Sequence, residues 1–156
     1  MRKRLIAPVH AVPACDQVWL DLERIASVEV TSEEVGYPIE SALSGEHNRG
    51  WRAAYPGTQI IRVLFDEPQS LRRIWLTFED IETTRTQEFV LRWSRSAAHP
   101  FQEILRQQWN FSRPDSVREV ENYSVGLREV AVLELMIEPD KSHNRARASL
   151  VSFRLG

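Results

Sequence analysis

The fold is decided by residues 28–51, which read V-E-V-T-S-E-E-V-G-Y-P-I-E-S-A-L-S-G-E-H-N-R-G-W. The segment opens with a short apolar strand pattern, followed by a polar turn that ends in Gly36, Tyr37 and Pro38. Residues 39–43 have the composition of one helical turn, and a glycine loop then leads to Trp51. From Trp51 to the C-terminus the apolar residues follow strand patterns, so this single turn separates an opening strand from an otherwise β-rich chain.

Four later segments alternate apolar and polar residues in the manner of half-buried strands. Their inward-facing residues are predicted to be Ile61, Val63 and Phe65, then Ile74, Leu76 and Phe78, then Phe89, Leu91 and Trp93, and finally Leu133, Leu135 and Ile137. Turn signals recur at roughly 8–12-residue spacing, which is typical of an all-β sandwich or barrel. The sequence therefore predicts about eight antiparallel strands.

The segments between these strands are assigned from composition and local period. Residues 66–70 contain Pro68 and are expected to form a turn. Residues 101–109 are predicted to be mainly extended. Residues 117–123 are predicted to form an exposed strand with Val117, Glu119 and Glu121 on one face.

Several of these segments, in this order, resemble a discoidin domain, also called a coagulation factor V/VIII type C domain. The similar segments are Tyr37-Pro38 with the helical turn after it, the glycine loop ending at Trp51, residues 59–68, residues 89–94, and residues 132–139 followed by Ala148-Ser149-Leu150. The resemblance implies a galactose-binding-like jelly-roll β-sandwich over residues 25–156. Residues 1–24 are then expected to form an N-terminal arm that packs on this domain.

The resemblance also bears on metal binding. Sugar-binding discoidin domains often hold a structural calcium ion with acidic residues near the glycine loop. Here Ser44, Arg49 and Ser152 occupy positions that differ from that pattern, and Glu46 is the single acid of the loop. Because calcium prefers six to eight oxygen ligands with several carboxylates among them, no cofactor and no structural calcium are expected.

Charge and motif content narrow the classes of function. A net charge of -2 and a pI near 6.1 argue against nucleic-acid binding, which usually requires a basic excess. No apolar run approaches the ~20 residues of a membrane-spanning helix. Binding to a membrane surface needs apolar loop tips, and only Tyr55 and Phe111 are candidates, so no membrane partner is expected. Paired-histidine zinc motifs, phosphate-binding glycine loops and nucleophile elbows are absent from the sequence, so a binding module is favoured over an enzyme.

The single cysteine bears on the compartment. Cys15 has no partner for an internal disulfide, whereas many secreted discoidin domains tie their ends with one. This difference favours a reducing compartment and a cytoplasmic protein. The basic residues 2–4 and the apolar segment after them resemble an export signal that leads to a lipoprotein box at Cys15, but Pro8, His10 and Pro13 interrupt it. Export as a lipoprotein is the alternative.

If each long strand crosses the whole sandwich, the loops at 45–58, 79–86, 110–116 and 139–146 share one rim. A sugar site needs an aromatic face for the ring and polar groups for its hydroxyls. The rim residues predicted to bind a carbohydrate are Arg52, Tyr55, Glu79, Trp109, Asn110 and His143. Trp51, Trp75 and Trp93 are instead expected in the core. The alternative function is a protein–protein interaction module that uses the same rim inside a cell.

Overall fold

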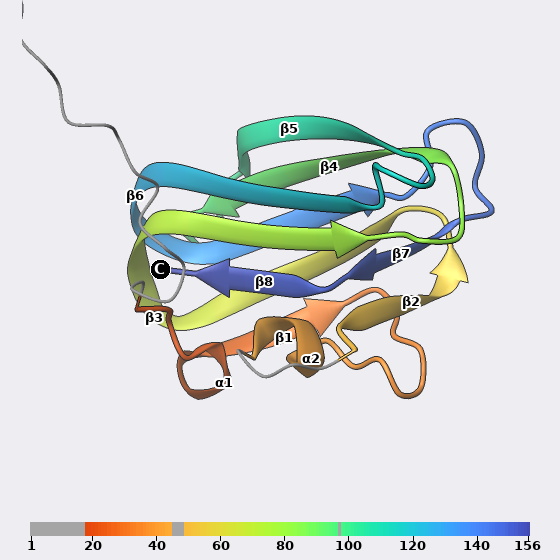
Figure 1. Cartoon of the computed structure of the whole chain (residues 1–156). Helices are drawn as coiled ribbons and strands as arrows, with labels where there is room; N and C mark the ends of the chain where they lie inside the picture. Colours follow the sequence, from red (N-terminus) through yellow and green to blue (C-terminus); the bar gives the residue numbers. More distant parts are fainter. Residues whose placement is uncertain (1–17, 45–48, 97) are drawn as a thin grey trace, which may run out of the picture.

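The computed structural model describes residues 18–44, 49–96 and 98–156. Two short helices and eight strands make up this part of the chain (Figure 1). In order they are α1 Leu22–Ile25, β1 Ala26–Val30, α2 Glu40–Leu43, β2 Trp51–Pro56, β3 Gln59–Glu79, β4 Arg85–Ser94, β5 Gln102–Phe111, β6 Arg118–Glu138, β7 Arg147–Leu150 and β8 Ser152–Leu155. The predicted all-β class and its eight antiparallel strands are confirmed.

The strands form one large and one small antiparallel sheet. The large sheet has the order β1-β3-β6-β4-β5, and β8 pairs with β3 outside this path. The small sheet consists of β2 and β7. Only Val151 separates β7 from β8, so the small sheet continues the layer to which β8 belongs (Figure 1).

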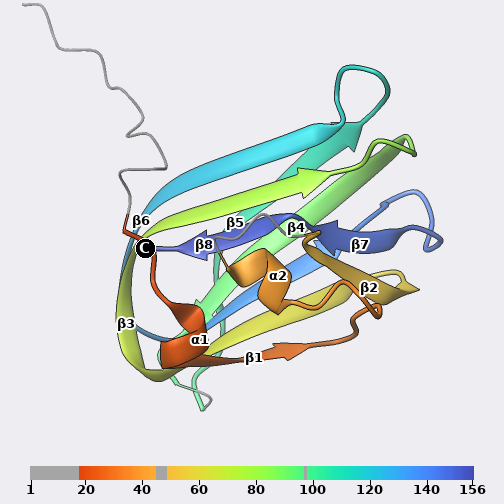
Figure 2. The ribbon, with the colours of Figure 1, turned by 60° about the horizontal axis from the view of Figure 1, so that its bottom comes forward.

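The long strands β3 and β6 bend together and contribute to both layers of the sandwich (Figure 2). The first half of β3 pairs with the second half of β6, as in Ile61 opposite Leu135. The second half of β3 pairs with the first half of β6, as in Phe78 opposite Glu119. Register shifts between Leu64 and Arg73 mark the bend.

The predicted turn at residues 66–70 was therefore wrong, because β3 continues through it. Pro68 is exposed on this part of the strand. Proline is tolerated where a strand is bulged and no ladder hydrogen bond is required, so its presence indicated a bend and not an end.

The core lies between the two layers and matches the predicted alternation. All of the residues predicted to face inward are buried, except Trp93, which is half-buried. Trp51 is buried in this core and Trp75 is half-buried. Residues 102–111 form strand β5, which confirms the extended prediction for this segment.

The prediction of an exposed strand at residues 117–123 was wrong about its faces. Glu119 is fully buried, whereas Val120 is 46% exposed. Phe78 faces the core and lies opposite Glu119 in the register, so Glu119 must share its face. The sequence pattern predicted no buried face for this strand, and pairing with β3 determines that the face of Glu119 is buried.

The loops of one end are connected by backbone hydrogen bonds (Figure 1, right). The β3–β4 loop meets the β5–β6 loop through Asp80 N–H and the Val117 carbonyl, at 2.8 Å. The β6–β7 loop meets β4 through Lys141 N–H and the Thr86 carbonyl, and it meets the β2–β3 turn through Gly57 N–H and the Ala146 carbonyl. These loops share one rim, as the sequence predicts. Residues 45–48 of the predicted rim, with Glu46, lie outside the described residues.

The end of the predicted N-terminal arm packs on the sandwich. Leu20 N–H donates to the Leu155 carbonyl at 2.8 Å, and the rings of Trp19 and Trp75 meet edge to face. Residues 1–17, with Cys15, lie outside the described residues, so the domain boundary at residue 25 stays a prediction. Among the described helices none has the length and apolar character to cross a membrane.

The contact between Gly50 and β7 offers a test of the fold. Gly50 has φ +75°, and a Cβ there would lie 2.5 Å from the Leu150 carbonyl oxygen. Gly57 has φ +93° with no atom near its Cβ position, so it is a matched control. We expect G57A to lower the free energy of unfolding by about 1–2 kcal/mol from backbone strain alone. G50A should lower it further, since β2 and β7 would have to separate, and urea unfolding measures both. Equal losses in the two variants would contradict the close approach.

Candidate functional site

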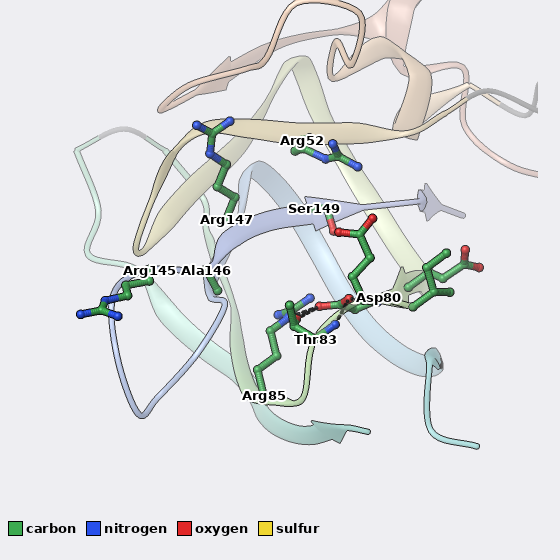
Figure 3. A pocket seen from close by; sticks show the side chains of 11 residues that line it. Arg52, Asp80, Thr83, Arg85, Arg145, Ala146, Arg147 and Ser149 are labelled. Carbon is green, nitrogen blue, oxygen red and sulfur yellow. Dashed lines mark hydrogen bonds and ion pairs between the residues drawn. The ribbon is translucent and has the colours of Figure 1, made fainter. Parts of the chain in front are cut away.

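A pocket of about 480 Å³ opens at the rim, between the β3–β4 loop and the outward face of β2 and β7 (Figure 3). We call it the rim pocket. Polar and charged side chains dominate its lining, which comprises Arg52, Glu79, Asp80, Ile81, Glu82, Thr83, Arg85, Arg145, Ala146, Arg147 and Ser149. Its volume is in the range of small-molecule sites.

One side of the rim pocket is a loop held rigid by Asp80. One carboxylate oxygen of Asp80 accepts hydrogen bonds from the backbone N–H groups of Glu82 and Thr83, at 2.8 and 3.0 Å. The other accepts from the Thr83 hydroxyl and from Arg85 Nε. Burial alone would raise the pKa of Asp80, but the hydrogen bonds from Arg85, Thr83 and Glu82 outweigh it and lower the pKa from 3.8 to about 2. The carboxyl is therefore ionised throughout the neutral range.

Arg85 joins this loop to the rest of the rim. Its side chain is almost fully buried, with Nε 2.6 Å from Asp80 Oδ2 and Nη1 2.6 Å from the Pro139 carbonyl oxygen. Nη1 also donates to Gln87, and the guanidinium lies 4.5 Å from the Phe111 ring centroid. Burying an ion pair costs desolvation free energy, which further hydrogen bonds to the charged groups can offset. Arg85 makes such hydrogen bonds to Pro139 and Gln87. The loops after β3 and β6 are thus fixed relative to each other.

The facing side consists of outward residues from β2 and β7. Trp51 and Ala53 point into the core, so Arg52 between them points out. Likewise Arg147 and Ser149 alternate with buried Ala148, and Ser149 lies opposite Arg52 in the register. Figure 3 shows Arg52 and Arg147 on this side and the group of Asp80, Thr83 and Arg85 across from it. The Arg52 guanidinium also stacks on Tyr37, 4.3 Å from its ring centroid.

A second hollow of about 420 Å³ adjoins the first, and Arg85 lines both. We call it the side pocket. Asn110 and His143 line it, and the Asn110 Oδ1 and both ring nitrogens of His143 already have partners within the protein. Asn110 Oδ1 accepts from the Thr86 hydroxyl. His143 Nδ1 accepts from the Arg145 N–H, so Nε2 carries the proton and donates to Asp140 Oδ2 at 3.0 Å.

The six residues predicted from sequence therefore occupy different places at this end. Arg52 and Glu79 line the rim pocket, and Asn110 and His143 line the side pocket. Tyr55 is 64% exposed on β2 and lines neither pocket. Trp109 is half-buried and packs against the core, beside Gln87 in the register. Among the described residues, the lining of the rim pocket includes no aromatic side chain.

Several residues of the rim pocket were not among those six. Asp80 and Thr83 belong to the β3–β4 loop, Arg85 is the first residue of β4, and Arg147 and Ser149 belong to β7. Alternation could have found the last two, because Ala148 and Leu150 are the inward residues of that strand.

The described residues do not fit a calcium ion. Ser44 offers one neutral hydroxyl oxygen and Arg49 is a cation, whereas calcium prefers several carboxylates. Among the residues that the structure describes, no group of three or more His, Cys, Asp or Glu side chains could hold a metal. Absence of a structural calcium stays a prediction, because Glu46 is outside those residues.

A buried carboxyl lies behind the rim. Gln87, which accepts from Arg85, donates to Glu119 Oε1 at 3.4 Å, and Glu119 Oε2 has no hydrogen-bond partner. Burial, and then the neighbouring Glu121 carboxyl, raise the pKa of Glu119 from 4.5 to about 8. Burial and Glu121 also raise the pKa of Tyr123, on the same face of β6. Glu119 is therefore largely protonated at neutral pH.

Comparison with solved structures identifies the fold. The family 32 carbohydrate-binding module of NanJ from C. perfringens, in complex with galactose, gives a TM-score of 0.62 at 13% identity, over 83% of this chain and 92% of that one. The family 32 module of AlyQ, in complex with 4,5-unsaturated mannuronic acid, gives 0.64 at 13% identity, over 90% and 98%. A third such module, from a family 31 glycoside hydrolase of Clostridium perfringens, gives 0.64 at 17% identity, over 88% and 93%.

The chain has the β-sandwich fold of these modules. The predicted jelly-roll β-sandwich architecture is confirmed by this likeness. No family model matches the sequence. No curated protein matches it either.

Glu119 predicts a dependence of stability on pH. Its pKa is raised in the folded state, so the folded protein holds the proton more tightly than the unfolded chain does. The resulting stability is complete below pH 4.5 and declines as pH rises toward about 8. Since one pKa unit corresponds to about 1.4 kcal/mol, the decline should be a few kcal/mol.

Urea unfolding at pH 4.5, 6 and 8 measures this decline. E119Q keeps a neutral side chain of the same size, so we expect it to flatten the profile and to be more stable than the parent at pH 8. E29Q, at an exposed position of β1, should keep the parental profile. If the stability of E119Q declines with pH as steeply as that of the parent, Glu119 is not the group responsible for the decline.

Proposed function

We propose that the chain is a non-catalytic carbohydrate-binding module that holds a sugar in the rim pocket. The observation that carries this proposal is the pairing of acceptors and donors on facing sides of one rigid pocket. Glu79 and Glu82 offer carboxylate oxygens, and Arg52 and Arg147 offer N–H groups. Neighbouring hydroxyls of a sugar ring both donate and accept, so they can bridge two such sides.

The rigidity of the rim supports a binding role. The hydrogen bonds of Asp80 and Arg85 fix the β3–β4 loop before a ligand arrives. Preorganised side chains lose little conformational entropy on binding, which favours affinity in a small site. The solved structures with this fold include modules in complex with galactose and with an unsaturated mannuronic acid, and this agrees with the proposal.

The pocket chemistry favours binding over catalysis. A glycoside hydrolase needs one carboxylic acid that is protonated near neutral pH and one carboxylate. Asp80 has a lowered pKa and is fixed by Arg85, and Glu79 pairs with Arg118 at 3.1 Å. Glu119, whose pKa is raised, is fully buried between the layers and does not line the pocket.

Isothermal titration with a panel of mono- and oligosaccharides tests the proposal. For a saccharide that binds, E79Q and R52Q should each weaken affinity at least tenfold, because each loses a charged hydrogen-bonding group worth about 1.5–3 kcal/mol. E103Q, at an exposed position near the start of β5, should leave affinity unchanged.

H143A separates the two pockets in the same experiment. It should have little effect, because His143 lines only the side pocket and its nitrogens are engaged within the β6–β7 loop. If H143A weakens binding strongly and E79Q does not, the sugar binds in the side pocket and not in the rim pocket. If no saccharide binds at millimolar concentration, the proposal fails and the protein-partner hypothesis takes its place.

A further inference from the structure

Two exposed arginines of the rim pocket share a single carboxylate. Arg52 Nη1 lies 3.5 Å from Glu34 Oε2, and Arg147 Nη1 lies 3.7 Å from Glu34 Oε1. Both distances exceed the 2.7–2.9 Å of a charge-assisted hydrogen bond. Glu34 Oε2 makes no hydrogen bond, and each guanidinium has five N–H donors. Most of the donor capacity of this pair is therefore unused.

The two arginines are brought together by the pairing of β2 and β7. Arg52 lies opposite Ser149, and Arg147 lies opposite Pro56, so both are outward residues of the small sheet. Their side chains remain 45% and 48% exposed. A ligand entering the rim pocket from solvent can therefore reach both.

The charges around the rim pocket do not balance. Two of its carboxylates are paired, Asp80 with Arg85 and Glu79 with Arg118. The backbone carbonyl of Glu82 accepts a hydrogen bond from Arg113. The described residues that line the pocket, together with the charged residues that pair with them or hydrogen-bond to them, carry six guanidinium groups and four carboxylates. The arginines are Arg52, Arg85, Arg113, Arg118, Arg145 and Arg147, and the acids are Glu34, Glu79, Asp80 and Glu82.

The excess of two positive charges lies toward β7. Arg52 and Arg147 face one carboxylate between them, and Arg145 adds a third guanidinium on the same side of the pocket. In Figure 3 the Arg145 side chain points away from the middle of the pocket, so Arg52 and Arg147 are the better placed pair. Arginine presents a planar fork of donors that matches a carboxylate.

We infer that the sugar bound in the rim pocket carries a carboxylate, which Arg52 and Arg147 hold between them. This inference rests on the function proposed above. Glu34 already places a carboxylate within reach of both guanidiniums, and a ligand carboxylate competes with it for the unused donors. The ligand class is thus a uronic acid or an oligosaccharide that contains one. The facing carboxylate of Glu79 accepts hydrogen bonds from its ring hydroxyls.

The experiment compares an acidic ligand with its uncharged methyl ester. Trigalacturonate and its full methyl ester have the same rings and linkages, but the ester has no carboxylate. We expect the acid to bind at least tenfold more tightly than the ester at about 50 mM NaCl in isothermal titration. This preference should shrink as NaCl is raised toward 1 M, where the Debye length falls to about 3 Å.

Three variants locate the charge that is responsible. R147Q should weaken binding of the acid at least tenfold and binding of the ester by a much smaller factor, because the ester loses only neutral hydrogen bonds to Arg147. E34Q should strengthen binding of the acid severalfold, because it removes the competing carboxylate. R128Q removes an exposed arginine at the register shifts in the middle of β6, away from the two ends of that strand at the rim, and should match the parent. Circular dichroism and thermal melting confirm that each variant is folded.

The outcomes separate this inference from the function on which it rests. Equal or tighter binding of the ester, or an equal loss in R128Q and R147Q, overturns the carboxylate inference while the module remains a sugar binder. The carboxylate inference is also overturned if a neutral saccharide binds most tightly and its binding is weakened by E79Q. If the acid, the ester and every neutral saccharide fail to bind, the proposed function is overturned as well.

Discussion

The structure depends on the antiparallel pairing of β3 with β6. Each of these strands is 21 residues long, and the pairing continues on both sides of their common bend. Because the bend carries the pair from one layer to the other, the two layers share a continuous hydrogen-bonded frame. β1 and β8 add to β3, and β4 adds to β6. The position of every loop at the rim follows from this arrangement.

The rim is built on that frame by a small number of charged contacts. β3 ends at Glu79, and Asp80 and Arg85 close the next turn against the carbonyl that follows β6. These contacts therefore join the loop that follows β3 to the loop that follows β6, at the rim end of both strands. Behind them, Gln87 and Glu119 continue the polar contacts into the interior. The site is thus rigid for reasons that are local to the rim and independent of any ligand.

Much of the architecture could be predicted from the sequence, since apolar alternation specifies which strand faces are buried. The rim could be predicted as well, because long strands send alternate loops to one end. The individual site residues were harder to predict. Trp109 has the composition of a sugar platform, yet β5 pairs with β4 in a register that directs it inward beside Gln87.

The buried face of β6 also could not be predicted from the sequence alone. Alternation cannot say which face of a polar strand is buried, and only pairing with Phe78 places Glu119 inside. Arg147 and Ser149 were not predicted as site residues, although they alternate with buried Ala148 and Leu150 and form a wall of the pocket. Cross-strand register, which joins residues far apart in sequence, carries the missing information.

The last residue of the chain is held in the sheet at the end opposite the rim. Gly156 exchanges hydrogen bonds with Arg73 on β3, and its carbonyl oxygen also accepts from the Arg72 N–H (Figure 1). A surface or a fused domain attached there is anchored to the central frame through several backbone bonds. A tether at this end therefore leaves the rim pocket at the far side of the molecule from the point of attachment.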